Sequence, residues 1–189
     1  MTHTANTTGV HDIGAIIERF GALLTLFPRL HPFRPCVLAG LGHCLYYRYL
    51  ISRRKDYLDT AILILTEALL PPSPSGPATS RFFHTTKVFY ELACCLAFRF
   101  ELARNPVDLE YAIKYCRYIL ILPPRAVVEI NCLEVLDNLV KLVACGIETG
   151  TVPSPDHAEE IIGFLQRFVG VDPRASTSYP SWRIWDICL

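Results

Sequence analysis

The chain has 189 residues and no net charge, because 18 Asp and Glu balance 18 Lys and Arg. This length suits one domain or one short repeat array, and a content of 51% hydrophobic residues is enough to bury a sizeable core. Nucleic-acid-binding proteins need a basic surplus to neutralise phosphates. We therefore expect a folded chain with no nucleic-acid partner.

The sequence has no predicted membrane span and no predicted signal peptide. The longest uncharged stretches after the N-terminal region are 35–47 and 68–80, whereas a span needs about 18–20 apolar residues. The N-terminus, MTHTANTTGVHD, has neither the basic start nor the apolar centre of a signal peptide. We therefore expect a cytoplasmic protein with no membrane partner, whose eight cysteines stay reduced.

Taken in chain order, the apolar residues predict seven helices and no strands. They recur at spacings of three and four, prolines and glycines mark the ends, and no useful stretch alternates with the strand period of two. We predict an all-α fold with a flexible N-terminus at 1–10 and a tail at 170–189. The predicted helices are 11–27, 35–53, 56–70, 80–104, 107–122, 125–146 and 156–169.

An internal repeat with a period of 51 residues is the strongest signal. LGHCLYYRYLISRRKDYLDTAI (41–62) aligns without gaps with LACCLAFRFELARNPVDLEYAI (92–113). Chance would give about one or two identities. The identical pairs are Leu41/Leu92, Cys44/Cys95, Leu45/Leu96, Arg48/Arg99, Arg53/Arg104, Leu58/Leu109, Ala61/Ala112 and Ile62/Ile113. This pattern is typical of stacked helix pairs, so we expect an α-solenoid with units at about 35–72, 80–124 and 125–173 after a lone helix.

The repeat resembles the tetratricopeptide unit, in which Leu-Gly on one helix precedes Ala, an aromatic, Ala and then Pro. The matching residues, with substitutions, are Leu41-Gly42, Leu92-Ala93, Ala61-Leu65-Ala68 and Ala112-Cys116-Ile119. HPFRP, LYYRY and YLDTAILILTEALLPP resemble the long-period tetratricopeptide-like arrays of fungal proteins, which often precede a caspase-like (CHAT) peptidase domain. The resemblance covers about residues 11–169. It implies that the first helix of each unit lines a concave surface.

That surface supplies the candidate partner-binding residues. They are His43, Tyr46, Tyr47, Lys87, Tyr90 and Phe98, with Ala39, Cys94 and Ala97 beside them. Aromatic side chains next to a few donors suit the capture of a peptide segment, and the alternative is that the aromatics only pack between helices.

The resemblance favours a non-enzymatic scaffold that binds a protein or peptide segment. One alternative is a regulatory repeat segment of a larger CHAT-type peptidase whose catalytic domain is absent from this chain. A second alternative is an inert gene product. We found no phosphate-binding glycine loop and no HExxH motif, so we expect no catalytic residue and no cofactor.

The adjacent Cys94 and Cys95 raise the question of thiol chemistry. Neighbouring residues on a helix point about 100° apart, so this pair cannot chelate one metal as a CxxC loop does. Cys95 shares its repeat position with Cys44, which is typical of a small packing residue, and no histidine lies in a motif that pairs with a thiol. We expect Cys44, Cys95 and Cys116 to be buried, reduced and free of metal.

Two further expectations concern recurring arginines and the ends of the chain. Arg48 and Arg99 recur in both copies, which favours a structural role, pairing with an acidic helix end, over ligand binding. The helix at 11–27 and the tail at 170–189 are rich in apolar residues. We expect the chain to self-associate through these ends, or neighbours in a longer array to cover them. The alternative is that the tail folds back over the last helix pair.

Overall fold

The computed structural model describes residues 5–70, 79–122, 131–150 and 155–169. Every regular element in these ranges is a helix, which confirms the predicted all-α class for the described part of the chain. The helices are α1 (Ala5–Leu26), α2 (Arg34–Ser52), α3 (Lys55–Ala68), α4 (Thr79–Ala103), α5 (Pro106–Ile121), α6 (Cys132–Glu148) and α7 (Pro155–Val169). None of them is long and apolar enough to cross a membrane.

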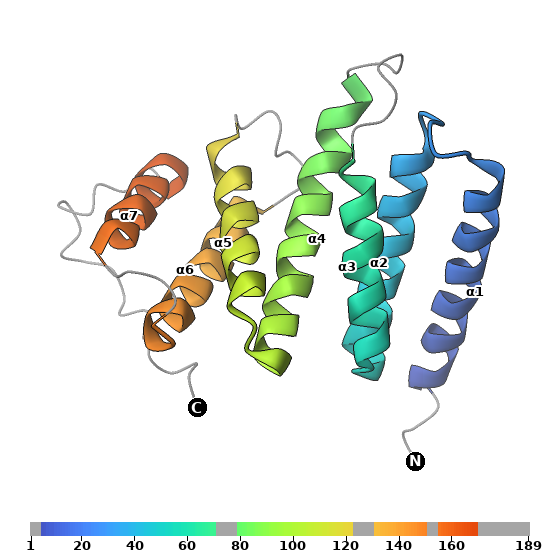
Figure 1. The fold of residues 1–189 in the computed structure, drawn as a ribbon, viewed down its shortest axis with the longest axis horizontal. Coiled ribbons are helices and arrows are strands. Elements are labelled where there is room, and N and C mark those ends of the chain that lie inside the picture. The colour runs from blue at the N-terminus through green and yellow to red at the C-terminus, as the bar shows by residue number, and fades with distance from the viewer. Residues whose placement is uncertain (1–4, 71–78, 123–130, 151–154, 170–189) are drawn as a thin grey trace.

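The helices follow one another across the molecule from α1 to α7 (Figure 1). Each packs against its neighbours in the sequence, and α2 also packs against α4. Arg117 of α5 pairs with Glu160 of α7 at 2.8 Å, and Arg167 of α7 donates to the carbonyl oxygens of Leu120 and Leu122. Polar contacts therefore join α7 to α5, in addition to the packing of α7 against its sequence neighbour α6.

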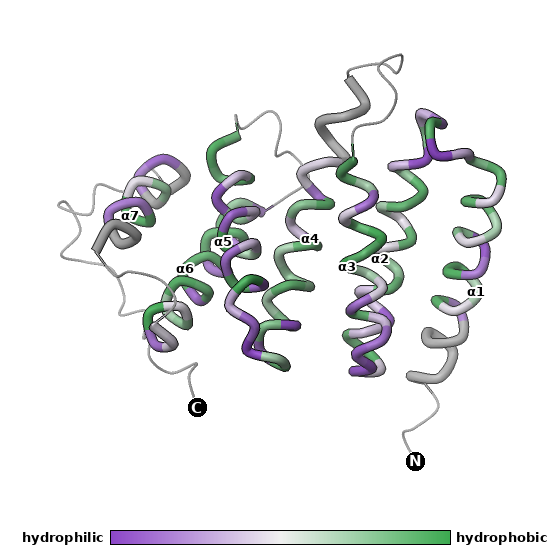
Figure 2. Tube along the Cα trace, in the orientation of Figure 1, coloured by the Kyte–Doolittle hydropathy of each residue, from purple (hydrophilic) through white to green (hydrophobic). Residues whose placement is uncertain are grey.

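The first unit (α2 and α3) and the second unit (α4 and α5) bury equivalent positions. Seven pairs, each 51 residues apart, lie in the core: Leu41/Leu92, Leu45/Leu96, Tyr49/Phe100, Leu58/Leu109, Ala61/Ala112, Ile62/Ile113 and Leu65/Cys116. Figure 2 shows hydrophobic residues in the coloured part of α4 and a hydrophilic turn between α2 and α3. Helices with one apolar face gain stability by packing that face against a neighbour, and both units use the same face.

The turn inside each unit is also repeated. Arg53 and Arg104 have left-handed backbones, with φ of 55° and 53°. Their N–H groups donate to the carbonyl oxygens of Tyr49 and Phe100, in each case at 2.7 Å. Each guanidinium lies over the ring of the residue that accepts this bond, at 5.8 and 5.5 Å from the centroid. A left-handed residue that closes a helix end is a common stop signal, so both connectors end the first helix in the same way.

Two helix starts differ by more than one residue from the sequence prediction. α1 begins at Ala5 rather than at 11, ahead of the apolar spacing on which the expected start rested. The sequence predicts that the sixth helix starts at 125 and so includes residue 131, and this is wrong for residue 131. Asn131 has an extended backbone, and its side chain accepts from the N–H of Leu133. This is the geometry of a helix N-cap, and α6 begins at Cys132. Residues 123–130 lie outside the described residues.

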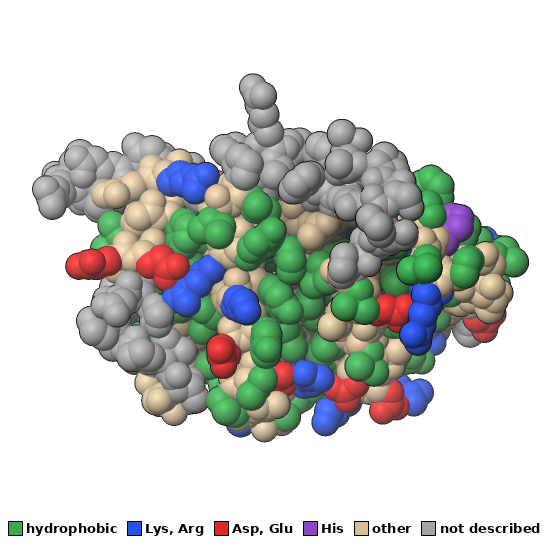
Figure 3. Space-filling view, turned by 45° about the horizontal axis from the view of Figure 1, so that its top comes forward, with side chains coloured by type: hydrophobic (Ala, Val, Ile, Leu, Met, Phe, Trp, Pro, Cys, Tyr) green, Lys and Arg blue, Asp and Glu red, His purple; other side chains and the backbone are tan. Residues whose placement is uncertain are grey.

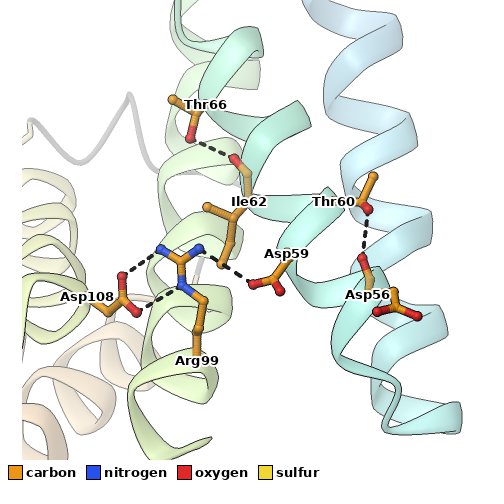
Figure 4. Close-up of polar contacts among 7 residues, drawn as sticks. All are labelled: Asp56, Asp59, Thr60, Ile62, Thr66, Arg99 and Asp108. Atoms are coloured by element: carbon orange, nitrogen blue, oxygen red, sulfur yellow. Dashed lines mark hydrogen bonds and ion pairs between the residues drawn. The ribbon is translucent and has the colours of Figure 1, made fainter. Parts of the chain in front are cut away.

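The predicted structural role of the recurring arginines is confirmed for Arg99, in the second unit (Figure 4). Arg99 of α4 donates two bonds to the carboxylate of Asp108, at 2.6 and 2.9 Å, and lies 3.6 Å from Asp59 of α3. Asp108 lies in the first turn of α5, and its side chain is only 3% exposed. The hydrogen bonds that Arg99 donates to Asp108 raise the pKa of Arg99. At the equivalent positions of the first unit, Arg48 lies over the ring of Tyr57, 5.6 Å from its centroid.

The cysteines follow the packing prediction in part. The seven described cysteines are free thiols, and Cys95 and Cys116 are buried as predicted. The prediction for Cys44 is wrong, because Cys44 is only partly buried. Gly40, one turn before Cys44, lies against the ring of Phe20 in α1. Cys44 lies one turn further along the side of α2 that α1 contacts. The equivalent Cys95 lies on α4, which packs against both α2 and α3.

The prediction of self-association falls partly outside the described residues. The tail at 170–189 lies there, as do the expected unit ends near 72, 124 and 173. The side chains of Ile16, Leu23 and Leu26 on α1 are exposed. α1 therefore keeps part of an apolar face open, and self-association remains a prediction.

Candidate functional site

A cavity of about 270 Å³ lies between α4 and α6. Residues of α4 and α6 form its walls, Cys116 of α5 also lines it, and Tyr46 of α2 borders it. We call this cavity the α4–α6 groove. The lining residues are Tyr46, Tyr90, Ala93, Cys94, Ala97, Phe98, Phe100, Glu101, Cys116, Glu134, Asn138, Lys141, Leu142 and Cys145.

The groove exists because α4 and α6 run parallel and are joined by side chains. The hydroxyl of Tyr90 donates to Glu134 Oε1 at 2.5 Å. One turn further along both helices, the amide of Asn138 donates to Cys94 Sγ at 3.9 Å and to Tyr90 Oη at 3.3 Å. The Tyr90–Glu134 and Cys94–Asn138 contacts each join residues 44 apart in the sequence, so α4 and α6 run in the same direction. The two helices therefore meet through a few side chains, and the cavity lies between them.

The centre of the groove is a cluster of neutral polar groups. The Cys94 thiol lies within hydrogen-bonding reach of the hydroxyls of Tyr46 and Tyr90. Burial raises the pKa of Cys94 to about 11, although the bonds from the two tyrosines lower it in part. Burial also raises the pKa of both tyrosines. At neutral pH these groups are therefore protonated, and Cys94 lacks the thiolate that nucleophilic chemistry requires.

Carboxylates outnumber ammonium groups on the lining. Glu134 lies near the Tyr90 end of the groove, and Glu101 lies near the other end. The only lysine among the lining residues, Lys141, is paired with Asp137 at 2.7 Å. Glu91 is a further buried carboxylate, and its charge raises the pKa of Cys94. The Tyr90 end of the groove is therefore rich in carboxylate groups.

The structure places the sequence candidates in two groups. Tyr46, Tyr90 and Phe98 line the groove, as do the neighbouring Cys94 and Ala97. The other candidates lie outside the lining of the groove: His43, Tyr47 and Lys87, with Ala39 partly buried beside the core.

His43 and Tyr47, which lie on α2 outside the groove, contact each other. His43 Nδ1 bonds to Glu91 Oε1 of α4, and the ring of Tyr47 lies 4.7 Å from the imidazole of His43. Lys87 is an exposed residue one turn before Glu91 on α4. His43 therefore joins α2 to α4 beside the groove, with Tyr47 packed on it.

Some lining aromatics also pack between helices, as the alternative expectation holds. Phe98 packs edge-on against Tyr49 of α2, with centroids 5.5 Å apart, and lies 6.3 Å from Tyr46. The same ring therefore supports the α2–α4 contact and presents a surface to the groove. Packing and binding are compatible at this position.

The sequence reasoning missed the wall that α6 contributes. Its members Glu134, Asn138, Lys141 and Cys145 follow the spacing 0, +4, +7 and +11, which places them on one helix face. That spacing is visible in the sequence. The 51-residue alignment ends at 113, so the repeat gave no equivalent positions on α6.

A second surface feature is apolar. Figure 3 shows hydrophobic side chains across the middle of one face, with charged side chains scattered among and around them. Exposed apolar residues on α3 and α5 include Leu63, Tyr111, Tyr118 and Ile121.

Within the described ranges, no three His, Cys, Asp or Glu side chains are grouped so that they could hold a metal ion. No family model, no curated protein and no solved structure matches this chain.

Proposed function

We propose that this chain is a protein–protein interaction scaffold built as a tetratricopeptide-like α-solenoid. In this proposal the α4–α6 groove receives a segment of a partner protein. The observation that carries it is a cavity of about 270 Å³ with aromatic and apolar walls beside a few polar groups. Recognition sites for peptide segments combine such walls with sparse, well-placed hydrogen-bonding groups.

Contacts between alternate helices support the solenoid. The first helices of successive units are joined by His43–Glu91 between α2 and α4 and by Tyr90–Glu134 between α4 and α6. The second helices α5 and α7 are joined by Arg117–Glu160. Stacked repeats bury each unit against its neighbours in this way, so the first helices form one layer and the second helices another.

The dimensions of the groove favour a side-chain anchor over a small metabolite. Pockets for drug-sized ligands usually have volumes of about 300–1,000 Å³, and this cavity lies just below that range. A volume of this size holds one large side chain. The rest of a partner segment would then lie along the exposed rims of α4 and α6.

A blocked groove tests the proposal. Ala97 lines the groove, whereas Ala103 is exposed on the same helix and does not line it. Ala97→Trp fills the groove with an indole, and Ala103→Trp is the matched control. The measurement is affinity capture from the source cells with quantitative mass spectrometry, after circular dichroism has shown that both variants are folded.

We expect Ala97→Trp to lose specific partners that the wild type and Ala103→Trp both retain. If the three proteins capture the same set, the groove is not the binding surface and the proposal fails.

A further inference from the structure

We propose that the anchor held by the α4–α6 groove is a lysine or arginine side chain of the partner segment, bound at the Tyr90–Glu134 end. This inference rests on the proposed function and adds the chemistry of the ligand. It predicts a basic peptide motif as the partner.

The local charge is complementary to a cation. Glu134 lines this end of the groove, and Glu91 lies beside Tyr90 with a side chain only 6% exposed. His43 is the described partner of Glu91, and Lys87 is exposed one turn away on α4. The ammonium of Lys141 is held by Asp137. An incoming cation would therefore meet the carboxylate of Glu134 without displacing an ion pair.

The Glu134 carboxylate is held in place before binding. Tyr90 donates to Oε1 at 2.5 Å, and the Tyr90 hydroxyl also accepts from Asn138. No described side chain donates to Oε2, so this oxygen can accept from a cation. A charge-assisted bond to a preorganised carboxylate is stronger than one between neutral groups.

Aromatic walls add a second attraction. A cation within about 6 Å of a ring centroid is stabilised by the ring. At the other end of the groove this interaction is already present, because Arg53 lies 5.9 Å from the Phe98 centroid and Arg104 lies 5.5 Å from that of Phe100. Among the described cations, none lies over Tyr46 or Tyr90. The Tyr90 end therefore offers unoccupied rings.

The two ends supply a matched pair of substitutions. Glu134→Gln removes the charge, yet its amide oxygen can still accept from Tyr90, so the groove keeps its shape. Glu101→Gln removes the same charge at the end that Arg104 and Lys141 border. Both glutamates are exposed, so neither substitution is expected to impair folding.

The experiment starts with a random peptide display library, selected on the full chain and counter-selected on Ala97→Trp. Fluorescence anisotropy then gives the Kd of each enriched peptide. We expect enriched peptides to share one Lys or Arg. Replacing it with norleucine, which keeps the aliphatic stem, should weaken binding about 5- to 10-fold.

Glu134→Gln should weaken the basic peptide by a similar factor and leave the norleucine peptide unchanged, whereas Glu101→Gln should change the Kd by less than about 2-fold. Groove-dependent peptides without a shared basic residue, or equal effects of the two Gln variants, overturn the cationic anchor and leave the scaffold proposal standing. An absence of peptides that depend on the groove contradicts both.

Discussion

The first unit (α2 and α3) and the second unit (α4 and α5) are alike inside and different outside. Seven equivalent positions lie in the hydrophobic core of both units, and both first helices end in a left-handed arginine. On the surfaces that face neighbouring units the residues differ, as at His43 and its equivalent Cys94. Burial restricts which residues can occupy the core positions of both units. The positions on the surfaces between units are less restricted, and there the two units carry different residues.

One pair of core positions shows how the two units pack different residues in one arrangement. A Cβ added at Gly42 would lie 2.5 Å from Leu65 Cδ2, so the glycine makes room for the leucine. In the second unit these positions hold Ala93 and Cys116, both buried. The larger residue on one helix is matched by a smaller one on the other, because well-packed interiors conserve total volume.

The largest expected difference between the units is at the recurring arginines. Asp108→Ala should lower the free energy of unfolding by about 2–3 kcal/mol, because it leaves Arg99 without its buried partner. Tyr57→Leu at the equivalent position should cost less than about 1 kcal/mol, since it removes only the ring beneath Arg48. Urea-induced unfolding measures both, and equal losses would contradict the different roles of the two arginines.

Alkaline pH should destabilise the protein through the second unit. Burial raises the pKa of Cys94 and Cys116 from 9.0 to about 11 and about 12. Because the folded-state pKa is the higher one, the stabilising contribution is complete below pH 9 and is lost as the pH rises toward 11–12. At pH 10 the loss should be about 1 kcal/mol for each thiol.

The control for this pH effect is the Cys94→Ala/Cys116→Ala protein. Its urea midpoint should fall less between pH 8 and pH 10 than that of the wild type. Equal falls would show that the two thiols ionise normally in the folded state.

The repeated cysteine position offers a smaller contrast. Cys95→Ala should cost about 1 kcal/mol, because the side chain is fully buried. Cys44→Ala should cost clearly less, since Cys44 is only partly buried beneath α1. Thermal or chemical denaturation of the two variants decides, and a larger cost at Cys44 would contradict the described burial.

The smallest effect is expected where the units agree most. Arg53→Gly and Arg104→Gly relieve a left-handed backbone that glycine adopts freely, but each also removes a guanidinium from an aromatic ring. We expect each variant to shift the unfolding free energy by a few tenths of a kcal/mol, in the same direction. Shifts of opposite sign, measured by urea denaturation, would show that the two turns are not equivalent.

The sequence was most informative where a signal occurs twice. The helices of both units, their shared turn and the packing role of Cys95 follow from the alignment of 41–62 with 92–113. Tyr46, Tyr90 and Phe98 were reached through the tetratricopeptide resemblance. The start of α6 and its wall of the groove were missed, because the alignment ends at residue 113 and the N-cap of α6, Asn131, was not recognised.

The repeat does not specify which neighbouring helices pack against each unit. Both the burial of Cys44 and the Glu91–His43 contact depend on those neighbours. α1 covers the first unit, whereas α2 and α3 cover the second. Identical residues in equivalent positions therefore meet different neighbours. This is the physical reason why packing inside a unit was easier to predict than the surface between units.

A double-mutant cycle at Gly42 and Leu65 most directly tests the claim that the two units share one packing arrangement. Gly42→Ala should be destabilising by about 1–2 kcal/mol despite the helix preference of alanine, because Leu65 is fully buried and crowds the new methyl group. Leu65→Cys alone should cost about 2–3 kcal/mol through the cavity that it leaves. The double variant, which carries the residues of the second unit, should be at least about 1 kcal/mol more stable than the sum of the single losses predicts. Additive losses in urea denaturation would contradict the shared arrangement.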